Sequence, residues 1–95
     1  MVKKVIFSPE ANERLAEIVS YLVNEWSTAS AEKFLNILDH KIENIKLFPQ
    51  SNPKLNINPG VRCCKVVKQI SIYYRIHDDE IEIVTLFDNR QKKDQ

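Results

Sequence analysis

The sequence has few of the residues that build common cofactor and metal sites. It contains one glycine, Gly60, and therefore lacks the glycine-rich loops that cradle nucleotide phosphates. Its two cysteines, Cys63 and Cys64, are adjacent, and a disulfide between neighbours in an extended strand would strain the backbone, so we expect free thiols. The two histidines, His40 and His77, are isolated in sequence and match no zinc-binding spacing. We therefore expect neither a metal nor a cofactor.

Long apolar runs are also missing. The first apolar run of the chain, Val2–Phe7, stops at Ser8 and Pro9. It is too short for the centre of a signal peptide or for a membrane span. We therefore expect a cytoplasmic protein without a membrane partner. The 95 residues fit a single domain, 1–95, and a content of 43% hydrophobic and 28% charged residues is typical of a soluble globule.

The net charge of +1 conceals an uneven distribution along the chain. Between Ser51 and His77 there is no acidic residue, whereas the basic residues are Lys54, Arg62, Lys65, Lys68 and Arg75. Acidic residues then cluster at Asp78, Asp79 and Glu80, within an expected turn. The segregation favours a positive patch that attracts phosphate, nucleic acid or an acidic protein. A solvated strand face explains the same pattern.

Two amphipathic helices are expected after the first apolar run. Ser8 has the side chain of a helix N-cap, and Pro9 suits the first helical position. Apolar residues then recur at spacings of three and four, first at Ala11, Leu15, Ile18 and Leu22 and again at Ala31, Phe34, Leu38, Ile42 and Ile45. Ser27 or Thr28 caps the second helix. The short connection predicts an antiparallel helical hairpin in which Trp26 packs near a helix end.

Strands are expected on both sides of this hairpin. Val2–Phe7 is short and rich in β-branched and aromatic residues, as strands are. After an exposed loop over residues 50–59, the apolar period changes to two, which predicts a meander of three further strands. These strands are Val61–Val67, Ile70–Ile76 and Ile81–Phe87. The last is almost continuously apolar and is therefore placed inside the sheet.

The element order predicts an α+β fold with two layers. A strand, two helices and three strands in succession favour a helical hairpin packed on one face of a mostly antiparallel four-stranded sheet. In the strand Ile70–Ile76, the isoleucines and Tyr74 alternate with Ser71, Tyr73 and Arg75. We expect the opposite sheet face to be open and to carry Tyr73 and Arg75.

Ordered motifs run through nearly the whole chain. They are "SPEANERLAEIVSYL", "ASAEKFLNILDHKIENIKLFP", "GVRCCKVVKQISIYYRI" and "IEIVTLFDNRQ". In this order and spacing they resemble toxins of the RelE/ParE superfamily from bacterial type II toxin–antitoxin modules, and more closely the ParE or plasmid-stabilisation branch. The resemblance also implies that the first strand lies beside the last one.

The resemblance implies a toxin but leaves two activities on one fold. ParE-like members poison DNA gyrase by binding, and RelE-like members cut mRNA in the ribosome, often with a histidine or tyrosine near the C-terminus. Neither residue type follows Phe87 in this chain. Arginine is a poor base, and Tyr73 has an ordinary pKa near 10. We predict a ParE-like toxin without catalytic residues; an mRNA endoribonuclease and a non-toxic interaction module of the same fold are the alternatives.

The residues expected to bind a target or antitoxin are basic, aromatic or amide side chains near the open face. They are Arg62, Lys65, Tyr73, Arg75, Arg90, Gln91 and Lys92. The resemblance implies a cognate antitoxin as the partner. Antitoxins of such families usually bind through a disordered acidic segment, which suits a basic surface. We expect it to bind the groove bordered by the helical hairpin and the sheet. DNA gyrase is the expected target, and the ribosome with its mRNA is the alternative.

Overall fold

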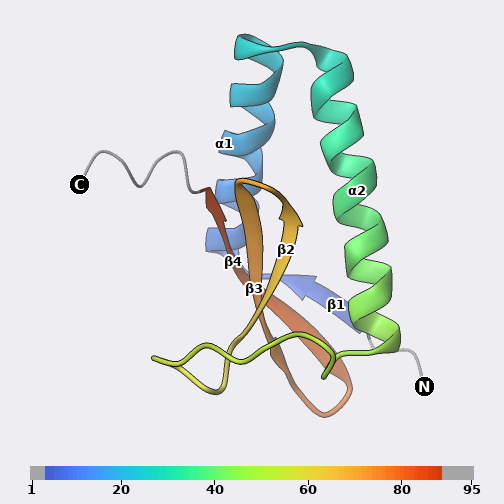
Figure 1. Ribbon diagram of the computed structural model, residues 1–95, viewed down its shortest axis with the longest axis vertical. Helices are drawn as coiled ribbons and strands as arrows, with labels where there is room; N and C mark the ends of the chain where they lie inside the picture. The colour runs from blue at the N-terminus through green and yellow to red at the C-terminus, as the bar shows by residue number, and fades with distance from the viewer. Residues whose placement is uncertain (1–3, 89–95) are drawn as a thin grey trace.

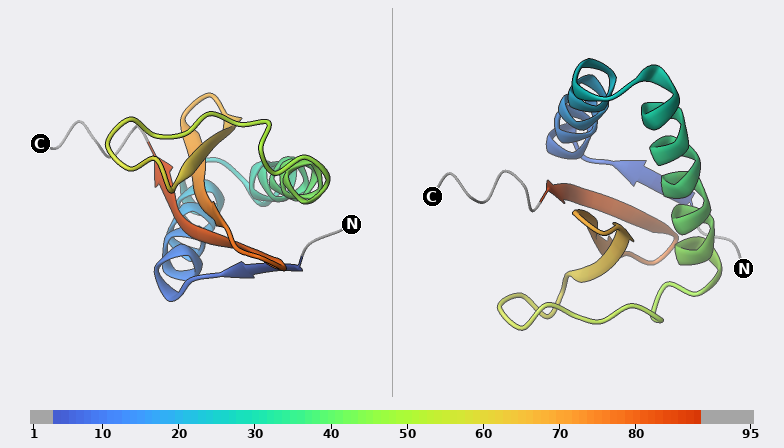
Figure 2. Two further views of the ribbon diagram at one scale, coloured as in Figure 1. Left: turned by 90° about the horizontal axis from the view of Figure 1, so that it is seen from below. Right: turned by 45° about the horizontal axis from the view of Figure 1, so that its top comes forward.

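The computed structural model describes residues 4–88. Its elements are β1 (Lys4–Phe7), α1 (Pro9–Glu25), α2 (Thr28–Leu47), β2 (Arg62–Val67), β3 (Ile70–Ile76) and β4 (Glu80–Asp88) (Figure 1). Both helices pack on one side of an open, mixed sheet (Figure 2). The predicted α+β fold and its element order are confirmed. No helix in the described range is long and apolar enough to span a membrane.

The four strands lie in the order β1-β4-β3-β2. Strand β1 is parallel to β4, with Lys4 opposite Glu80 and Phe7 opposite Ile83, while the other two pairings are antiparallel. The expected neighbourhood of the first and last strands is therefore confirmed, as is the position of β4 inside the sheet. The strand begins at Glu80, which the sequence interpretation had left in the preceding turn.

Ser8 fixes the start of α1 to the middle of β4. Its hydroxyl accepts a hydrogen bond from the Ala11 N–H at 3.0 Å, which is the expected N-cap contact. The same hydroxyl donates to the Val84 carbonyl at 2.7 Å, and the Ser8 N–H donates to the Ile83 carbonyl at 3.0 Å. Val84 is an extra residue in the pairing, because Tyr73 lies opposite Thr85 and Tyr74 opposite Ile83. The Ser8 hydroxyl thus donates a hydrogen bond to a carbonyl at a β-bulge.

The connection between the helices is as short as expected. Ser27 is the N-cap of α2, and its hydroxyl accepts from the Ser30 N–H at 3.0 Å. Trp26, at the end of α1, is 68% exposed, so the prediction that it packs at the helix end is wrong. The reason is visible in Figure 1, where this end of the hairpin extends beyond the sheet and no strand lies beneath it.

The core lies between the helical hairpin and one sheet face. It contains Ala11, Ile18, Phe34, Leu38, Ile45, Cys64, Val66, Ile70, Ile72, Tyr74, Ile81, Ile83 and Leu86. The predicted alternation in β3 is confirmed, because Ile70, Ile72 and Tyr74 are buried whereas Arg75 is exposed. The opposite face of the sheet, called the outer face below, is therefore free of covering helices (Figure 2).

Candidate binding surfaces

The strand register brings three of the predicted site residues to the outer face. Tyr73 lies opposite Cys63 and Thr85, and Ser71 lies opposite Lys65 and Phe87, so these side chains share one face. Arg75 lies two residues farther along β3, opposite Glu82. Lys65, Tyr73 and Arg75 therefore occupy one surface, in line with the expectation for an open face.

The cations of this surface form no ion pair within residues 4–88. Lys65 and Arg75 are exposed, and their side chains make no hydrogen bond or ion pair within that range. Glu82, the strand neighbour of Arg75, instead lies 3.1 Å from the His77 ring, between His77 Nε2 and Glu82 Oε1. The two cations can therefore pair with an anion or carboxylate of a partner without breaking an ion pair within residues 4–88.

An aromatic pair lies on the same face as these cations. The rings of Tyr73 and Phe87 are stacked with centroids 6.2 Å apart and an interplanar angle of 11°. Burial raises the pKa of the Tyr73 phenol above its ordinary value, and the neighbouring Cys63 raises it further. The phenol is therefore neutral at physiological pH and offers a hydrogen-bond donor beside a flat apolar surface.

Arg62 lies on the other side of the sheet from Arg75. It is opposite Tyr74, which faces the core, and its guanidinium Nη1 donates to the carbonyls of Asn52 at 2.6 Å and Gln50 at 3.3 Å. The Tyr74 hydroxyl donates to the Pro49 carbonyl at 2.7 Å and accepts from the Asn52 amide at 3.1 Å. Arg62 and Tyr74 together hold the loop that follows α2.

The remaining predicted site residues, Arg90, Gln91 and Lys92, lie outside the described residues. No group of three metal-ligating side chains exists within residues 4–88. The thiols of Cys63 and Cys64 are free, and burial raises the pKa of the Cys64 thiol. A buried neutral thiol behaves as a small apolar core side chain.

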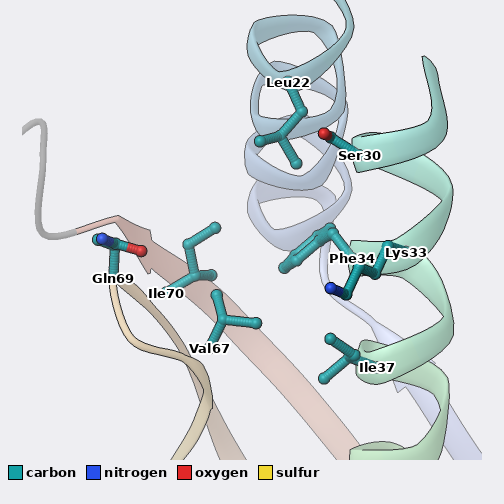
Figure 3. Close-up of a pocket in the computed structure, with 8 residues that line it drawn as sticks. All are labelled: Leu22, Ser30, Lys33, Phe34, Ile37, Val67, Gln69 and Ile70. Atoms are coloured by element: carbon teal, nitrogen blue, oxygen red, sulfur yellow. The ribbon is translucent and has the colours of Figure 1, made fainter. Parts of the chain in front are cut away.

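A pocket opens where the helical hairpin meets the turn between β2 and β3 (Figure 3). It has a volume of about 200 Å³ and is lined by Leu22, Ser30, Lys33, Phe34, Ile37, Val67, Gln69 and Ile70. The sequence analysis expected a groove bordered by the helical hairpin and the sheet, and it named none of these lining residues as binding residues. The one signal available was that Lys33 directly precedes the buried Phe34, which places it at the border of the apolar stripe of α2.

A model of the ParE toxin of parDE-type type II toxin–antitoxin systems matches residues 5–93 of the chain. The chain belongs to the ParE toxin family. As a ParE-family member it is a toxin of the type II toxin–antitoxin class, which agrees with the resemblance stated from the sequence motifs. The match covers the helical hairpin, β2, β3, β4 and all of β1 except Lys4.

Solved structures of low sequence identity share the ParE-family fold. A chain of the chromosomal ParDE toxin–antitoxin system from P. aeruginosa superposes with a TM-score of 0.77 at 18% identity, covering 92% of this chain and 96% of that one. A chain of the RelBE2 toxin–antitoxin complex from Mycobacterium tuberculosis superposes with a TM-score of 0.66 at 13% identity, covering 93% of this chain and 99% of that one. A chain of the YoeB dimer from Staphylococcus aureus superposes with a TM-score of 0.62 at 16% identity, covering 92% of this chain and 97% of that one. No curated protein matches the chain in sequence.

Proposed function

We propose that this ParE-family toxin acts by binding DNA gyrase and that a cognate antitoxin neutralises it. The observation that carries the proposal is the outer face, where the unneutralised cations of Lys65 and Arg75 flank the ring of Tyr73. Arginine and aromatic side chains are enriched where proteins bind each other, because they combine contact area with directed hydrogen bonds. A poison that acts by binding requires such a surface and no reaction centre.

The chemistry of Tyr73 supports binding over catalysis. RNA cleavage by attack of a 2′-hydroxyl requires a group that accepts its proton. Because burial raises the pKa of Tyr73, its phenolate is scarce at neutral pH and the residue is a poor base. As a neutral phenol, it is instead suited to hydrogen bonding within an interface.

One contact favours a second candidate, RelE-like cleavage of mRNA in the ribosome. His77 lies 3.1 Å from Glu82, which is the strand neighbour of Arg75. A carboxylate that orients an imidazole is a common arrangement for a general base, and an arginine beside it can stabilise a phosphorane. The sequence analysis treated His77 only as an isolated histidine and did not foresee this pairing.

Two assays separate the candidates. Induced expression of the chain should arrest growth, and the purified protein should inhibit supercoiling by purified gyrase while ribosome-bound mRNA stays intact. Intact supercoiling together with cleaved mRNA would replace the first candidate with the second, and loss of that cleavage in His77→Ala would place the reaction at His77. Absence of growth arrest would leave the non-toxic interaction module.

The outer-face proposal predicts the behaviour of one double variant. Lys65→Glu with Arg75→Glu should weaken gyrase inhibition by about tenfold or more, because reversed charges oppose the same partner surface. Both side chains are exposed, so the fold should be retained. Lys54→Glu, which makes half of that charge change in the exposed loop after α2, is the control. Equal inhibition by all three proteins would contradict a role of the outer face.

A further inference from the structure

The loop after α2 returns to the sheet in the form of a short hairpin. Lys54 forms an antiparallel bridge with Arg62 at the start of β2. Next to this bridge, the Leu55 N–H donates to the Val61 carbonyl at 2.9 Å. The segment between these pairs, residues 56–60, is called the loop tip below. It is held on both sides in the way that paired strands hold the turn of a β-hairpin.

The loop tip also has hydrogen bonds of its own. The Val61 N–H donates to the Asn58 carbonyl at 2.9 Å, and the Gly60 N–H donates to the Asn58 side-chain oxygen at 3.2 Å. Pro59, which lies between these donors, has a restricted φ. The guanidinium of Arg62 fixes the other end of the loop through two carbonyls. The loop tip therefore has a defined shape before any partner binds.

Ile57 is presented to solvent by this loop tip. Its side chain is 93% exposed, the highest value among the large apolar side chains of residues 4–88, and Trp26 follows with 68%. Burial of an isoleucine by a partner releases its hydration, and the ordered loop keeps the entropic cost of binding low. Ile57 therefore has the properties of an anchor residue, an apolar side chain that fills a depression on a partner protein.

The loop tip lies at the end of the sheet where Arg75 lies. Because Arg62 is opposite Tyr74, the residues that precede Arg62 lie toward the end of β3 that carries Arg75. The pocket lies at the other end of β2, where this strand turns into β3 (Figure 1). No acidic residue occurs between Ser51 and His77, so the loop tip and the outer face have the same basic character. An acidic protein surface that covers Arg75 therefore also reaches the loop tip.

We propose that Ile57 anchors this toxin to its target protein by filling an apolar depression beside the acidic surface that the outer face binds. The inference rests on the proposed function, because it takes gyrase as the target. The apolar contact supplies affinity that salt does not screen, whereas the cations of Lys65 and Arg75 orient the partner. The loop after α2 is thus a second binding element, next to the outer face.

The test measures inhibition of gyrase supercoiling by the full-length chain at low and high salt. Ile57→Ala should raise the half-inhibitory concentration about tenfold at both salt concentrations, because the lost contact is apolar. Ile57→Leu, which keeps an apolar side chain of equal size, should stay within about threefold of the wild type. Both variants should keep the wild-type urea midpoint, since the side chain is 93% exposed. Wild-type inhibition by Ile57→Ala would overturn the proposal.

A matched control separates this site from exposed apolar surface in general. Trp26→Ala removes a larger exposed side chain at the tip of the helical hairpin, which lies at the opposite end of the molecule from the loop (Figure 1). Its half-inhibitory concentration should stay within about twofold of the wild type. An equal loss of inhibition in Trp26→Ala and Ile57→Ala would overturn a specific role of the loop tip.

Two binding measurements test other occupants of the loop tip. The dissociation constant of the antitoxin encoded beside the gene should change by less than about twofold in Ile57→Ala. A loss of antitoxin affinity with unchanged gyrase inhibition would assign the loop tip to the antitoxin. Sedimentation tests a second copy of the chain, and self-association that Ile57→Ala abolishes with unchanged inhibition would assign the loop tip to that copy. Either result overturns the proposal.

Growth arrest on induced expression distinguishes this inference from the proposed function. Arrest by the wild type without gyrase inhibition would refute gyrase as the target, and loss of that arrest in Ile57→Ala would still support an anchor for another target. Full gyrase inhibition by both the wild type and Ile57→Ala would refute this inference alone. Absence of arrest and of inhibition in the wild type would refute both.

Discussion

Tyr74 combines a buried ring with a hydroxyl that reaches the loop after α2. The ring belongs to the core, and the hydroxyl donates to the Pro49 carbonyl and accepts from the Asn52 amide. Arg62, its strand neighbour, holds the same loop through the carbonyls of Gln50 and Asn52. This pair is therefore a structural clamp, whereas Lys65, Tyr73 and Arg75 form the candidate binding surface.

Removal of the Tyr74 hydroxyl should destabilise the fold. Tyr74→Phe leaves the Pro49 carbonyl and the Asn52 amide without their shared partner, and we expect a loss of about 1–3 kcal/mol in the free energy of unfolding. Urea denaturation measures this loss. Tyr73→Phe is the matched control, because the Tyr73 hydroxyl has no hydrogen bond within residues 4–88, and its stability should change by less than about 0.5 kcal/mol. Equal effects of both substitutions would contradict the clamp.

The same hydroxyl should make stability depend on alkaline pH. Burial raises the pKa of Tyr74 above its ordinary value of about 10, so the folded state holds the phenol proton more tightly than the unfolded state. This contribution is present below about pH 10 and is lost as the pH rises through the raised pKa. Urea midpoints measured from neutral pH upward should fall in that range, and less steeply in Tyr74→Phe. An identical fall in the variant would exclude Tyr74 as a source.

At the scale of elements, the two helices begin in different ways. Ser8 caps α1 and also joins it to the β4 bulge through its hydroxyl and its N–H. Ser27 caps α2 at the exposed tip of the hairpin, where its hydroxyl also donates to the Ser30 hydroxyl. The first cap therefore holds the two layers together, while the second acts within the hairpin alone.

This difference predicts unequal costs of two identical substitutions. Ser8→Ala should lower the free energy of unfolding by about 2–3 kcal/mol, because the cap and the bond to the Val84 carbonyl are both lost. Ser27→Ala should cost about 1 kcal/mol, the usual value for a solvated cap. Thermal and urea unfolding of both variants provide the comparison. A larger cost for Ser27→Ala would show that the link to the bulge contributes little.

At the scale of the whole molecule, one core connects both layers. The buried cluster includes residues of α1, α2, β2, β3 and β4, with Val5 and Phe7 of β1 packed against it. The two candidate surfaces lie on different sides of this core: the outer face on the exposed side of the sheet, and the pocket under the hairpin. The two candidate surfaces therefore belong to one packed unit.

A continuous core predicts unfolding as a single unit. Far- and near-ultraviolet circular dichroism should give coincident urea transitions, because neither layer can bury its apolar face alone. The fluorescence of Trp26 should change little, since this residue is already 68% exposed in the folded state. Two separate transitions would contradict the expectation of one domain over residues 1–95.

The sequence by itself determined the features that depend on near neighbours in the chain. The N-cap of Ser8, the alternation of Tyr73 and Tyr74, and the order of helices and strands follow from side-chain chemistry and spacing over a few residues. From these, the two-layer fold and an outer face that carries Tyr73 and Arg75 could be predicted.

Only the tertiary structure decided which residues meet across long stretches of chain. The Ser8 hydroxyl donates to a carbonyl 76 positions away in the chain. Arg62 binds the loop after α2 and does not lie on the outer face. Trp26 is exposed because this end of the helical hairpin extends beyond the sheet. The lining of the pocket is of the same kind, since it combines residues of α1, α2, β2 and β3. Local patterns set each element and its faces, but packing between elements determines which faces remain available.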